Sequence, residues 1–342
     1  MSHKKSEKSQ KAYNQMDHLT HAYRRSQVVF TAYESGLFDN LSGSDGKTAD
    51  QVAADLQLSN KGVTRLLTAL CALNIIKKKQ ELYKVSKGFK PLLNSESDDY
   101  LGGMFDHEIH LYKRWSRLLE SVKSGQPVKK TNKKRSVQDT KRFINAMETL
   151  GRRSSPKVIN KLKLKDNQHI LDLGGGPGVY MESFFTKRPQ MKVTLFDQGE
   201  TIRYAQKRLA THPFYDRMFF KEGDLLKDGY GKNYDIIFIS NVIHIYGPDK
   251  IFDILKKCHT ALKPKGRVFI KDFFLNKQRT GPEFSSQFSL HMLLSSEDGE
   301  CYSISEMLAL LERSGFKKER LIKLRRNTRI IESKKTAAIK PI

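Results

Sequence analysis

The sequence predicts an α/β fold: a mostly parallel sheet with helices on both faces, preceded by a mainly helical domain. From His169 onward, short uninterrupted apolar runs alternate with stretches of helical periodicity, which is typical of strands buried on both faces. A glycine-rich turn follows the first run, as in open sheets that bind ligands at their carboxyl edge. The expected strands are Ile170–Leu173, Val193–Phe196, Arg217–Phe220, Asp235–Ile239 and Arg267–Ile270.

Composition limits the class of protein. A chain of 342 residues suggests two domains, and 38% hydrophobic residues suffice for a substantial core. We expect neither a signal peptide nor a membrane span, since the polar start and the lack of an apolar run of ~18 residues favour neither. The cysteines Cys71, Cys258 and Cys301 are widely spaced, which indicates a reduced cytoplasmic protein and no cysteine zinc site.

The net charge of +25 is large and leaves several partners open. It is compatible with nucleic acid, an anionic lipid surface or an acidic substrate, and equally with a solvated basic surface. We expect at most weak binding to anionic surfaces.

The first part of the chain has the element order of a winged helix. Residues 1–15 are polar and expected to be disordered. Thr48 and Gln51 form a predicted capping box, Ser59 can cap a second helix, and two short strands follow at Ile75–Lys78 and Leu82–Val85. We assign 16–95 to this domain and 96–165 to a helical linker with a polar, basic loop at 126–140.

The winged helix is a common DNA-binding element, so its second helix decides whether DNA binding is expected. Its second helix, Asn60–Leu73, carries only Lys61 and Arg65 as basic residues. A helix that reads the major groove needs several polar and basic side chains on its exposed face. The sequence therefore does not favour specific nucleic-acid binding.

The strongest local signal is the run Ile170–Gly178, in which a buried strand ends in a tight glycine-rich turn and a helix begins. Backbone amides at such a helix start face a ligand, and glycines let the ligand approach closely. The dinucleotide fingerprint is an alternative, but Val179 stands at its third glycine position. Instead Asp172 precedes the glycines Gly174, Gly175, Gly176 and Gly178.

Two further acids stand at strand ends. Asp197 ends the next strand, where a carboxylate can bind both hydroxyls of a ribose. Asp224 follows the third strand. All three acids are expected at the carboxyl edge of one sheet.

The chain resembles the small-molecule O-methyltransferases that include plant caffeate and bacterial hydroxyneurosporene-type enzymes. The resemblance lies in the winged-helix region and in Asp172–Gly178, Ser240–Tyr246, Lys271–Leu275, Thr280–Pro282, Gly299–Glu306 and Ser314–Phe316. It implies a Rossmann-like class I methyltransferase domain at 166–335 and a homodimer formed through the winged helix. It also implies S-adenosylmethionine as cofactor, S-adenosylhomocysteine as product, and no metal.

The resemblance also implies roles for single residues. Asp172 would hold the cofactor's amine, Asp197 its ribose, and Asp224 with Leu225 its adenine. Ser240 stands near the cofactor, where plant members often have a lysine. His244 matches the family's general base and Asp272 the acid that orients it. Glu300 and Cys301 match the second plant acid poorly, so they receive no role.

A base is what the chemistry requires. A phenol with a pKa near ~10 is a poor nucleophile at neutral pH unless a positioned group takes its proton, and an imidazole can do so. The simpler alternatives are a histidine that donates to a backbone carbonyl and an aspartate that caps a turn.

Seven residues fall where family members line the substrate pocket, although Met and aromatic residues at helical spacing are also ordinary core. They are Met104, Phe105, Phe143, Met147, Phe288, His291 and Met292. We predict transfer of a methyl group to a hydroxyl of a small aromatic, polyene or quinone-like acceptor. Transfer to nitrogen or carbon, a non-methylating role, and a nucleic-acid substrate remain alternatives.

Overall fold

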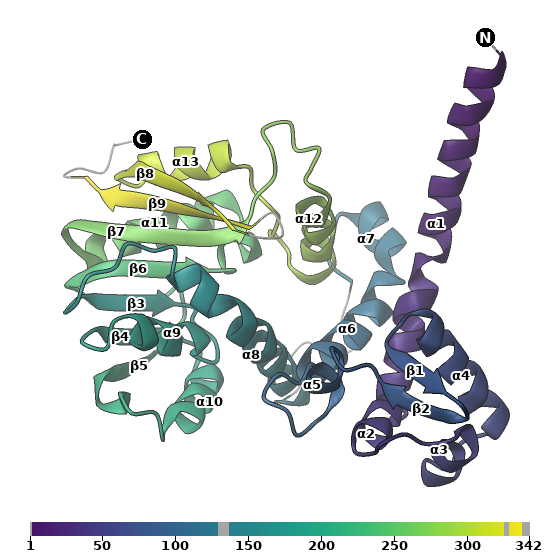
Figure 1. The fold of residues 1–342 in the computed structure, drawn as a ribbon. Coiled ribbons are helices and arrows are strands. Elements are labelled where there is room, and N and C mark those ends of the chain that lie inside the picture. The colour runs from purple at the N-terminus through teal and green to yellow at the C-terminus, as the bar shows by residue number, and fades with distance from the viewer. Residues whose placement is uncertain (1, 129–136, 325–327, 337–342) are drawn as a thin grey trace. The chain divides into compact units, whose positions relative to one another are not determined.

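The computed structural model describes residues 2–128, 137–324 and 328–336. The chain divides into two compact units, Met1–Ile109 and His110–Ile342 (Figure 1). The division falls inside helix α6 (Gly102–Trp115). Residues 129–136 of the basic loop expected at 126–140 lie outside the described residues. Its last four positions, 137–140, are helical instead, because helix α8 (Val137–Ile159) begins there.

The N-terminal unit contains the predicted winged-helix order. Helices α3 (Ala49–Asp55) and α4 (Asn60–Ala72) precede strands β1 (Ile76–Lys79) and β2 (Leu82–Val85), which pair antiparallel. Thr48 and Gln51 form the reciprocal capping box, and the Ser59 side chain caps α4. The apolar faces of these helices bury Val63, Leu67 and Leu70 with Ile76 and Val85 in one core.

The N-terminal segment differs from expectation. Helix α1 (Ser2–Glu34) extends through the segment expected to be disordered. Its Lys, Gln and Ala residues are good helix formers, and extending an existing helix avoids the cost of nucleation. Helix α2 (Leu37–Ser42) follows, and its Leu37, Phe38 and Leu41 are buried in the core. The remaining helix of this unit is α5 (Lys90–Leu93).

The C-terminal unit is built on a seven-stranded sheet with the order β5-β4-β3-β6-β7-β9-β8 (Figure 1). The parallel strands are β3 (His169–Leu173), β4 (Lys192–Asp197), β5 (Met218–Glu222), β6 (Tyr234–Ser240) and β7 (Leu262–Phe273). They correspond to the five predicted strands. A C-terminal hairpin, β8 (Phe316–Lys323) and β9 (Thr328–Lys335), adds to the edge of β7 in antiparallel pairing.

Each face of this sheet packs against its own helices. Residues of α9 (Val179–Lys187) and α10 (Gly199–Leu209) form one core with Ile236 and Phe238. Residues of α11 (Pro248–Ala261) and α13 (Ile304–Arg313) form another with Ile237 and Ile239. Alternate residues of β6 thus enter opposite layers, as the pleat requires. The other helices are α7 (Leu118–Ser124), α12 (Glu283–Ser295) and the short η1 (Tyr215–Arg217) and η2 (Ile243–Ile245).

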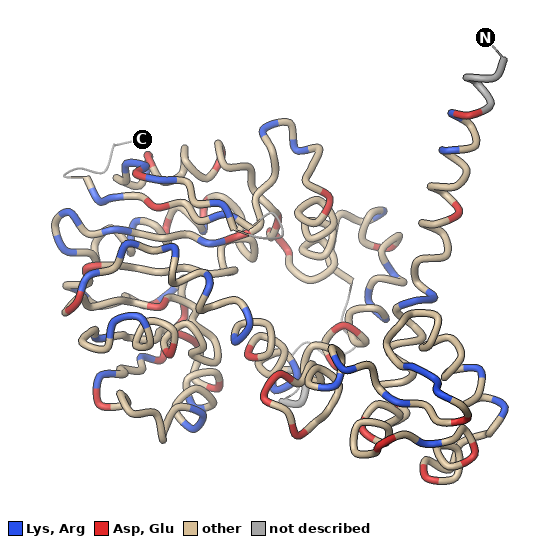
Figure 2. The backbone as a smooth tube through the Cα atoms, viewed as in Figure 1, with Lys and Arg blue, Asp and Glu red and all other residues tan. Residues whose placement is uncertain are grey.

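Basic residues are spread over both units rather than gathered on a single element (Figure 2). Within the described ranges, none of the helices has the length and apolar character needed to cross a membrane.

Candidate functional site

The glycine-rich turn joins β3 to α9 with a backbone that favours glycine. Gly174, Gly176 and Gly178 all have positive φ, and Gly174 (φ 71°) also packs closely. A Cβ on Gly174 would lie 2.6 Å from a Val242 methyl carbon, so the loop after β6 closes directly against this turn. Neither the conformation nor the space admits a larger residue. The turn thus brings the backbone of α9's first residues to the carboxyl edge of the sheet.

Asp172 and Asp197 are held at this turn in different ways. Asp172 is 1% exposed, and its Oδ2 atom has no hydrogen-bond partner among the described residues. Burial, reinforced by the Asp197 carboxylate, raises the pKa of Asp172 to about 8. Asp197 accepts hydrogen bonds from the Gly176 amide (2.9 Å) and the Gln198 amide (2.7 Å). Burial raises the pKa of Asp197 as well, although these bonds oppose the shift.

Asp224 and Leu225 lie in the loop after β5. Asp224 accepts from the Leu226 amide (2.7 Å), and its own amide donates to Asp228 (2.7 Å). The Leu225 side chain is 7% exposed, and its carbonyl accepts a hydrogen bond from Tyr230 (2.8 Å). These bonds fix the loop beside the ends of β4 and β5.

The ends of β6 and β7 carry polar groups that face each other. Ser240 pairs in register with Lys271, and the Ser240 Oγ atom is buried without a hydrogen-bond partner in the described chain. Asn241 adopts φ 57°, and its side-chain oxygen accepts from Lys271 Nζ (2.8 Å). Asn241 and Lys271 lie inside the motifs that carry the resemblance, but neither was predicted as a site residue.

His244 and Asp272 form a buried pair, as predicted from the resemblance. The Nδ1 atom of His244 donates to Asp272 Oδ1 at 2.7 Å, and the two side chains are 9% and 4% exposed. The same oxygen accepts from the Phe273 amide (2.8 Å), which fixes the carboxylate at the end of β7. With Nδ1 engaged, Nε2 is the ring nitrogen left to accept a proton. The pair has the chemistry of an oriented base.

Aromatic rings surround this pair. Phe288 meets the His244 ring edge to face at 4.8 Å, and Phe273 lies 4.7 Å from Phe288. His291 lies 5.5 Å from Phe288 and stacks on Trp115 at 6.4 Å. Of the seven predicted lining residues, Phe288 therefore contacts His244 directly, and His291 contacts Phe288. Trp115, which stacks on His291, was not among the predicted lining residues.

The other predicted lining residues have different surroundings. Phe105 is buried in the core of the N-terminal unit beside Tyr33 (5.0 Å), and Met104 packs against the same core. Phe143 and Met147 are half-buried one turn apart on α8, and Met292 is buried on α12. A lining role for these five residues stays a prediction.

An ion-pair network lies beside the glycine-rich turn. Arg208 of α10 donates to Glu148 of α8 (2.9 Å), to Glu182 of α9, and to the Pro177 carbonyl (3.1 Å). Tyr204 also donates to Glu148 (2.6 Å). Burial alone would raise the pKa of Glu148, but hydrogen bonds from Tyr204 and Arg208 lower it. This network ties three helices to the turn.

Glu300 takes part in a surface ion pair, and Cys301 is buried. Arg279 pairs with Glu300 and with Glu306 (2.8 Å), the latter being part of the capping box of α13. Cys301 is fully buried, and burial raises the pKa of its thiol to about 12. Such a thiol stays protonated at neutral pH, which does not suit a nucleophile.

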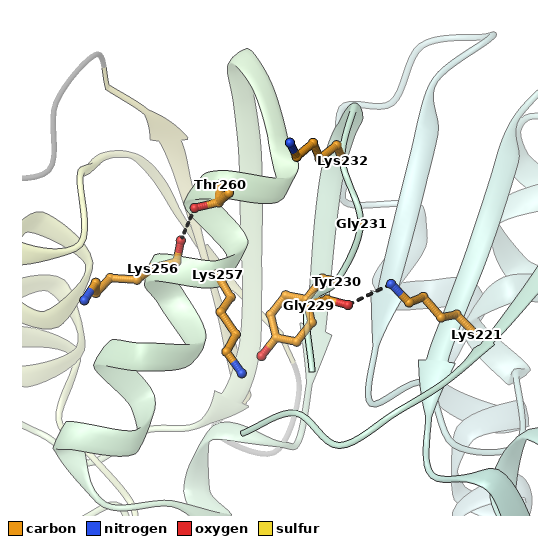
Figure 3. A pocket seen from close by; sticks show the side chains of 8 residues that line it. All are labelled: Lys221, Gly229, Tyr230, Gly231, Lys232, Lys256, Lys257 and Thr260. Atoms are coloured by element: carbon orange, nitrogen blue, oxygen red, sulfur yellow. Dashed lines mark hydrogen bonds between the residues drawn. The ribbon is translucent and has the colours of Figure 1, made fainter. Parts of the chain in front are cut away.

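A separate cleft of about 540 Å³ is lined by Lys221, Tyr230 and Lys257 among other residues. Figure 3 shows these side chains. Lys221 donates to the Gly229 carbonyl (2.7 Å), and Lys257 donates to the carbonyls of Leu225 (3.0 Å) and Leu226 (2.6 Å). These lysines anchor loop backbone. Neither His244 nor Asp272 lines this cleft, so it is distinct from the candidate catalytic site.

Comparison with known protein families agrees with this geometry. The model of the O-methyltransferase domain matches residues 122–317, and that of the O-methyltransferase dimerisation domain matches residues 17–90. The chain therefore belongs to the O-methyltransferase family and is a methyltransferase.

Individual relatives match nearly the whole chain at low identity. The S-adenosyl-L-methionine-dependent methyl transferase PigF of Serratia sp. (strain ATCC 39006) is 26% identical, with 96% of each chain covered. Acetylserotonin O-methyltransferase of Macaca mulatta is 25% identical, covering 89% of this chain and 92% of that protein. The solved structure of human N-acetylserotonin methyltransferase in complex with SAM has a TM-score of 0.86 at 23% identity, covering 95% and 98% of the two chains.

Proposed function

We propose that the protein transfers a methyl group from S-adenosylmethionine to a hydroxyl of a small, flat, aromatic acceptor, with His244 as general base. The observation that carries the proposal is the buried His244–Asp272 pair at 2.7 Å, bordered by aromatic rings at the carboxyl edge of a parallel sheet. Ligands of open α/β sheets bind at this edge.

The residues at the turn fit the cofactor. Asp172 has a buried oxygen without a partner, which suits the cationic amine of the amino-acid tail. The glycines leave room for a close approach of the ligand, Asp197 stands where a carboxylate binds a ribose, and Asp224 and Leu225 stand where adenine would lie. When bound, S-adenosylmethionine supplies a methyl group on a sulfonium, a leaving group that becomes a neutral thioether.

His244 performs the proton transfer. Its Nε2 atom takes the proton of the acceptor hydroxyl while the acceptor oxygen forms a bond to the methyl carbon and the bond from that carbon to sulfur breaks. Asp272 holds the ring through Nδ1 and stabilises the imidazolium that results. The proton then leaves to solvent. A positioned general base usually raises the rate by ~10²–10⁴.

The walls of the site favour a flat acceptor. Phe288 and Phe273 offer ring faces and edges next to His244, and the aromatic row continues from Phe288 through His291 to Trp115. Aromatic pairs gain ~0.5–1.5 kcal/mol beyond their buried area, so an aromatic ring is bound better than an aliphatic one of equal size.

The winged-helix unit is proposed to form a homodimer. Support comes from the match of residues 17–90 to the dimerisation domain and from the low basic content of α4. A reducing compartment such as the cytoplasm suits three cysteines that are all free, two of them buried.

The test uses the full chain with methyl-labelled S-adenosylmethionine and a panel of hydroxyindoles, naphthols, catechols and aliphatic alcohols of matched size, together with fractionated cell extract and total RNA. We expect the label in an aromatic hydroxyl compound, with the new methyl on oxygen by NMR.

Three outcomes would contradict the proposal. Label on nitrogen or carbon would change the reaction assigned to the site. Label in the RNA fraction that disappears steeply with salt would indicate a nucleic-acid substrate. Full turnover by His244→Ala at neutral pH would remove the base assignment.

A further inference from the structure

Lys271 is a buried cation that the proposed reaction does not use. It is 6% exposed, at the carboxyl end of β7. Its Nζ donates to Asn241 Oδ1 (2.8 Å) and lies 6.0 Å from the ring centre of Tyr180 and 5.8 Å from that of Phe273. No carboxylate among the described residues forms an ion pair with it. An ammonium group has three donors, so this one keeps donors for a ligand.

Two of the groups around Lys271, Tyr180 and Asn241, belong to the glycine-rich turn and the loop that closes against it, whereas Phe273 borders His244. Tyr180 is in the first turn of α9, just after the glycine-rich turn. Asn241 precedes Val242, whose side chain packs against Gly174. The ammonium is thus held between the helix start and the loop that closes against it.

Strand register places two unpartnered groups in line with Lys271. Asp172 of β3 pairs with Phe238 of β6, and Ser240 of β6 pairs with Lys271 of β7. Because Phe238 and Ser240 are two residues apart on one strand, all of these side chains belong to the same face of the sheet. Asp172 Oδ2 and Ser240 Oγ are both buried without hydrogen-bond partners in the described chain.

This face therefore presents an acid, a hydroxyl and an ammonium across three adjacent strands. Neighbouring strands are ~4.8 Å apart, so the row is short enough for flexible side chains to reach one small zwitterion. A buried charge is costly unless an opposite charge and hydrogen bonds compensate for it. An α-amino acid group would match this row, with its ammonium toward Asp172 and its carboxylate toward Ser240 and Lys271. It would pair with both charged side chains and give the Ser240 hydroxyl a hydrogen-bond partner.

We propose that Lys271, together with Ser240, binds the carboxylate of the cofactor's amino-acid tail, opposite the ammonium at Asp172. The inference rests on the proposed use of S-adenosylmethionine. It makes Lys271 a cofactor-positioning residue, since holding both charged groups on the α-carbon of the tail restricts where the sulfonium lies relative to His244.

Calorimetry with three ligands tests this assignment. S-adenosylhomocysteine carries the whole tail, its decarboxylated analogue lacks only the carboxylate, and 5′-methylthioadenosine lacks the amino acid. We expect Lys271→Met to weaken S-adenosylhomocysteine binding by about 10- to 100-fold, the value of a charge-assisted hydrogen bond. It should leave the other two ligands within twofold, and Lys271→Arg should restore most of the loss.

Lys263→Met is the matched control. Lys263 lies near the other end of β7, pairs with Asp235 at 2.9 Å, and its replacement removes the same charge. The Lys263→Met variant should bind S-adenosylhomocysteine with the same affinity as the wild type.

Equal losses for all three ligands would overturn the inference in favour of a purely structural role for Lys271. Unchanged S-adenosylhomocysteine binding with a raised KM for the acceptor would also overturn it and assign Lys271 to the acceptor. Wild-type protein that binds none of the three would overturn the proposed function, and the inference with it.

Discussion

Binding of the cofactor should release a proton from Asp172. Burial and the Asp197 carboxylate raise the pKa of Asp172 to about 8, so at pH 7 about nine in ten molecules carry this proton before binding. An ammonium placed next to an aspartate lowers its pKa by ~1–3, and a drop of ~2 gives a bound value of about 6. At pH 7 only about one in ten then remains protonated, so about 0.8 proton is released per ligand. At pH 5 both states are protonated, and the release falls to about 0.1.

The assay is titration calorimetry of S-adenosylhomocysteine at pH 7 in several buffers of different ionisation enthalpy. The slope of the observed heat against that enthalpy counts the protons. Asp172→Asn is the control, since it keeps the shape and removes the ionisable group. Binding heats that do not depend on the buffer at pH 7 would refute the reasoning, because Asp172 would then not change its charge when the ligand binds.

Two further predictions concern the framework of the site, and a third concerns the dimer. Glu148→Gln should lower the free energy of unfolding by about 1–3 kcal/mol at pH 7, because Arg208 loses a charged partner. The pKa of Glu148 is lowered in the folded state, so this contribution is present above the unfolded pKa of ~4.3 and is lost as pH falls through the folded value. Urea titrations should therefore show the stability difference between the wild type and the variant shrinking below about pH 4. A stability difference that does not change with pH would contradict this prediction. Gly174→Val should weaken S-adenosylhomocysteine binding at least ~10-fold by forcing a side chain into a left-handed backbone beside Val242, whereas Gly229→Ala, with open space at its Cβ, should bind normally. In analytical ultracentrifugation the wild type should be a dimer at micromolar concentration, and a monomer would argue against the role given to residues 17–90.

Local signals in the sequence were sufficient for much of the fold. The capping box at Thr48 and Gln51 forms as predicted because its bonds join residues three apart, with no help from the rest of the chain. The five parallel strands were visible as uninterrupted apolar runs, since both of their faces are buried. Their ends moved by only a few residues.

Features that depend on distant contacts were not predictable. The hairpin β8–β9 extends the sheet at its edge, and the exposed charged residues of β8 conceal the strand pattern. The site was recognised through the resemblance at His244 and Asp272, whose 2.7 Å contact joins residues from different elements. Lys271 was not predicted as a site residue because lysines are usually on the surface, and its burial depends on how distant parts of the chain pack around the end of β7.

The most direct test of the central claim is the pH dependence of kcat/KM for His244→Gln with a phenolic acceptor. At pH 7 we expect a loss of ~10²–10⁴ relative to the wild type, with S-adenosylhomocysteine affinity nearly unchanged. The loss should shrink as pH rises toward the phenol's own pKa of ~10, because an already ionised acceptor needs no base. A variant that keeps wild-type turnover at pH 7, or whose deficit stays constant up to pH ~10, would contradict the role of His244 as general base.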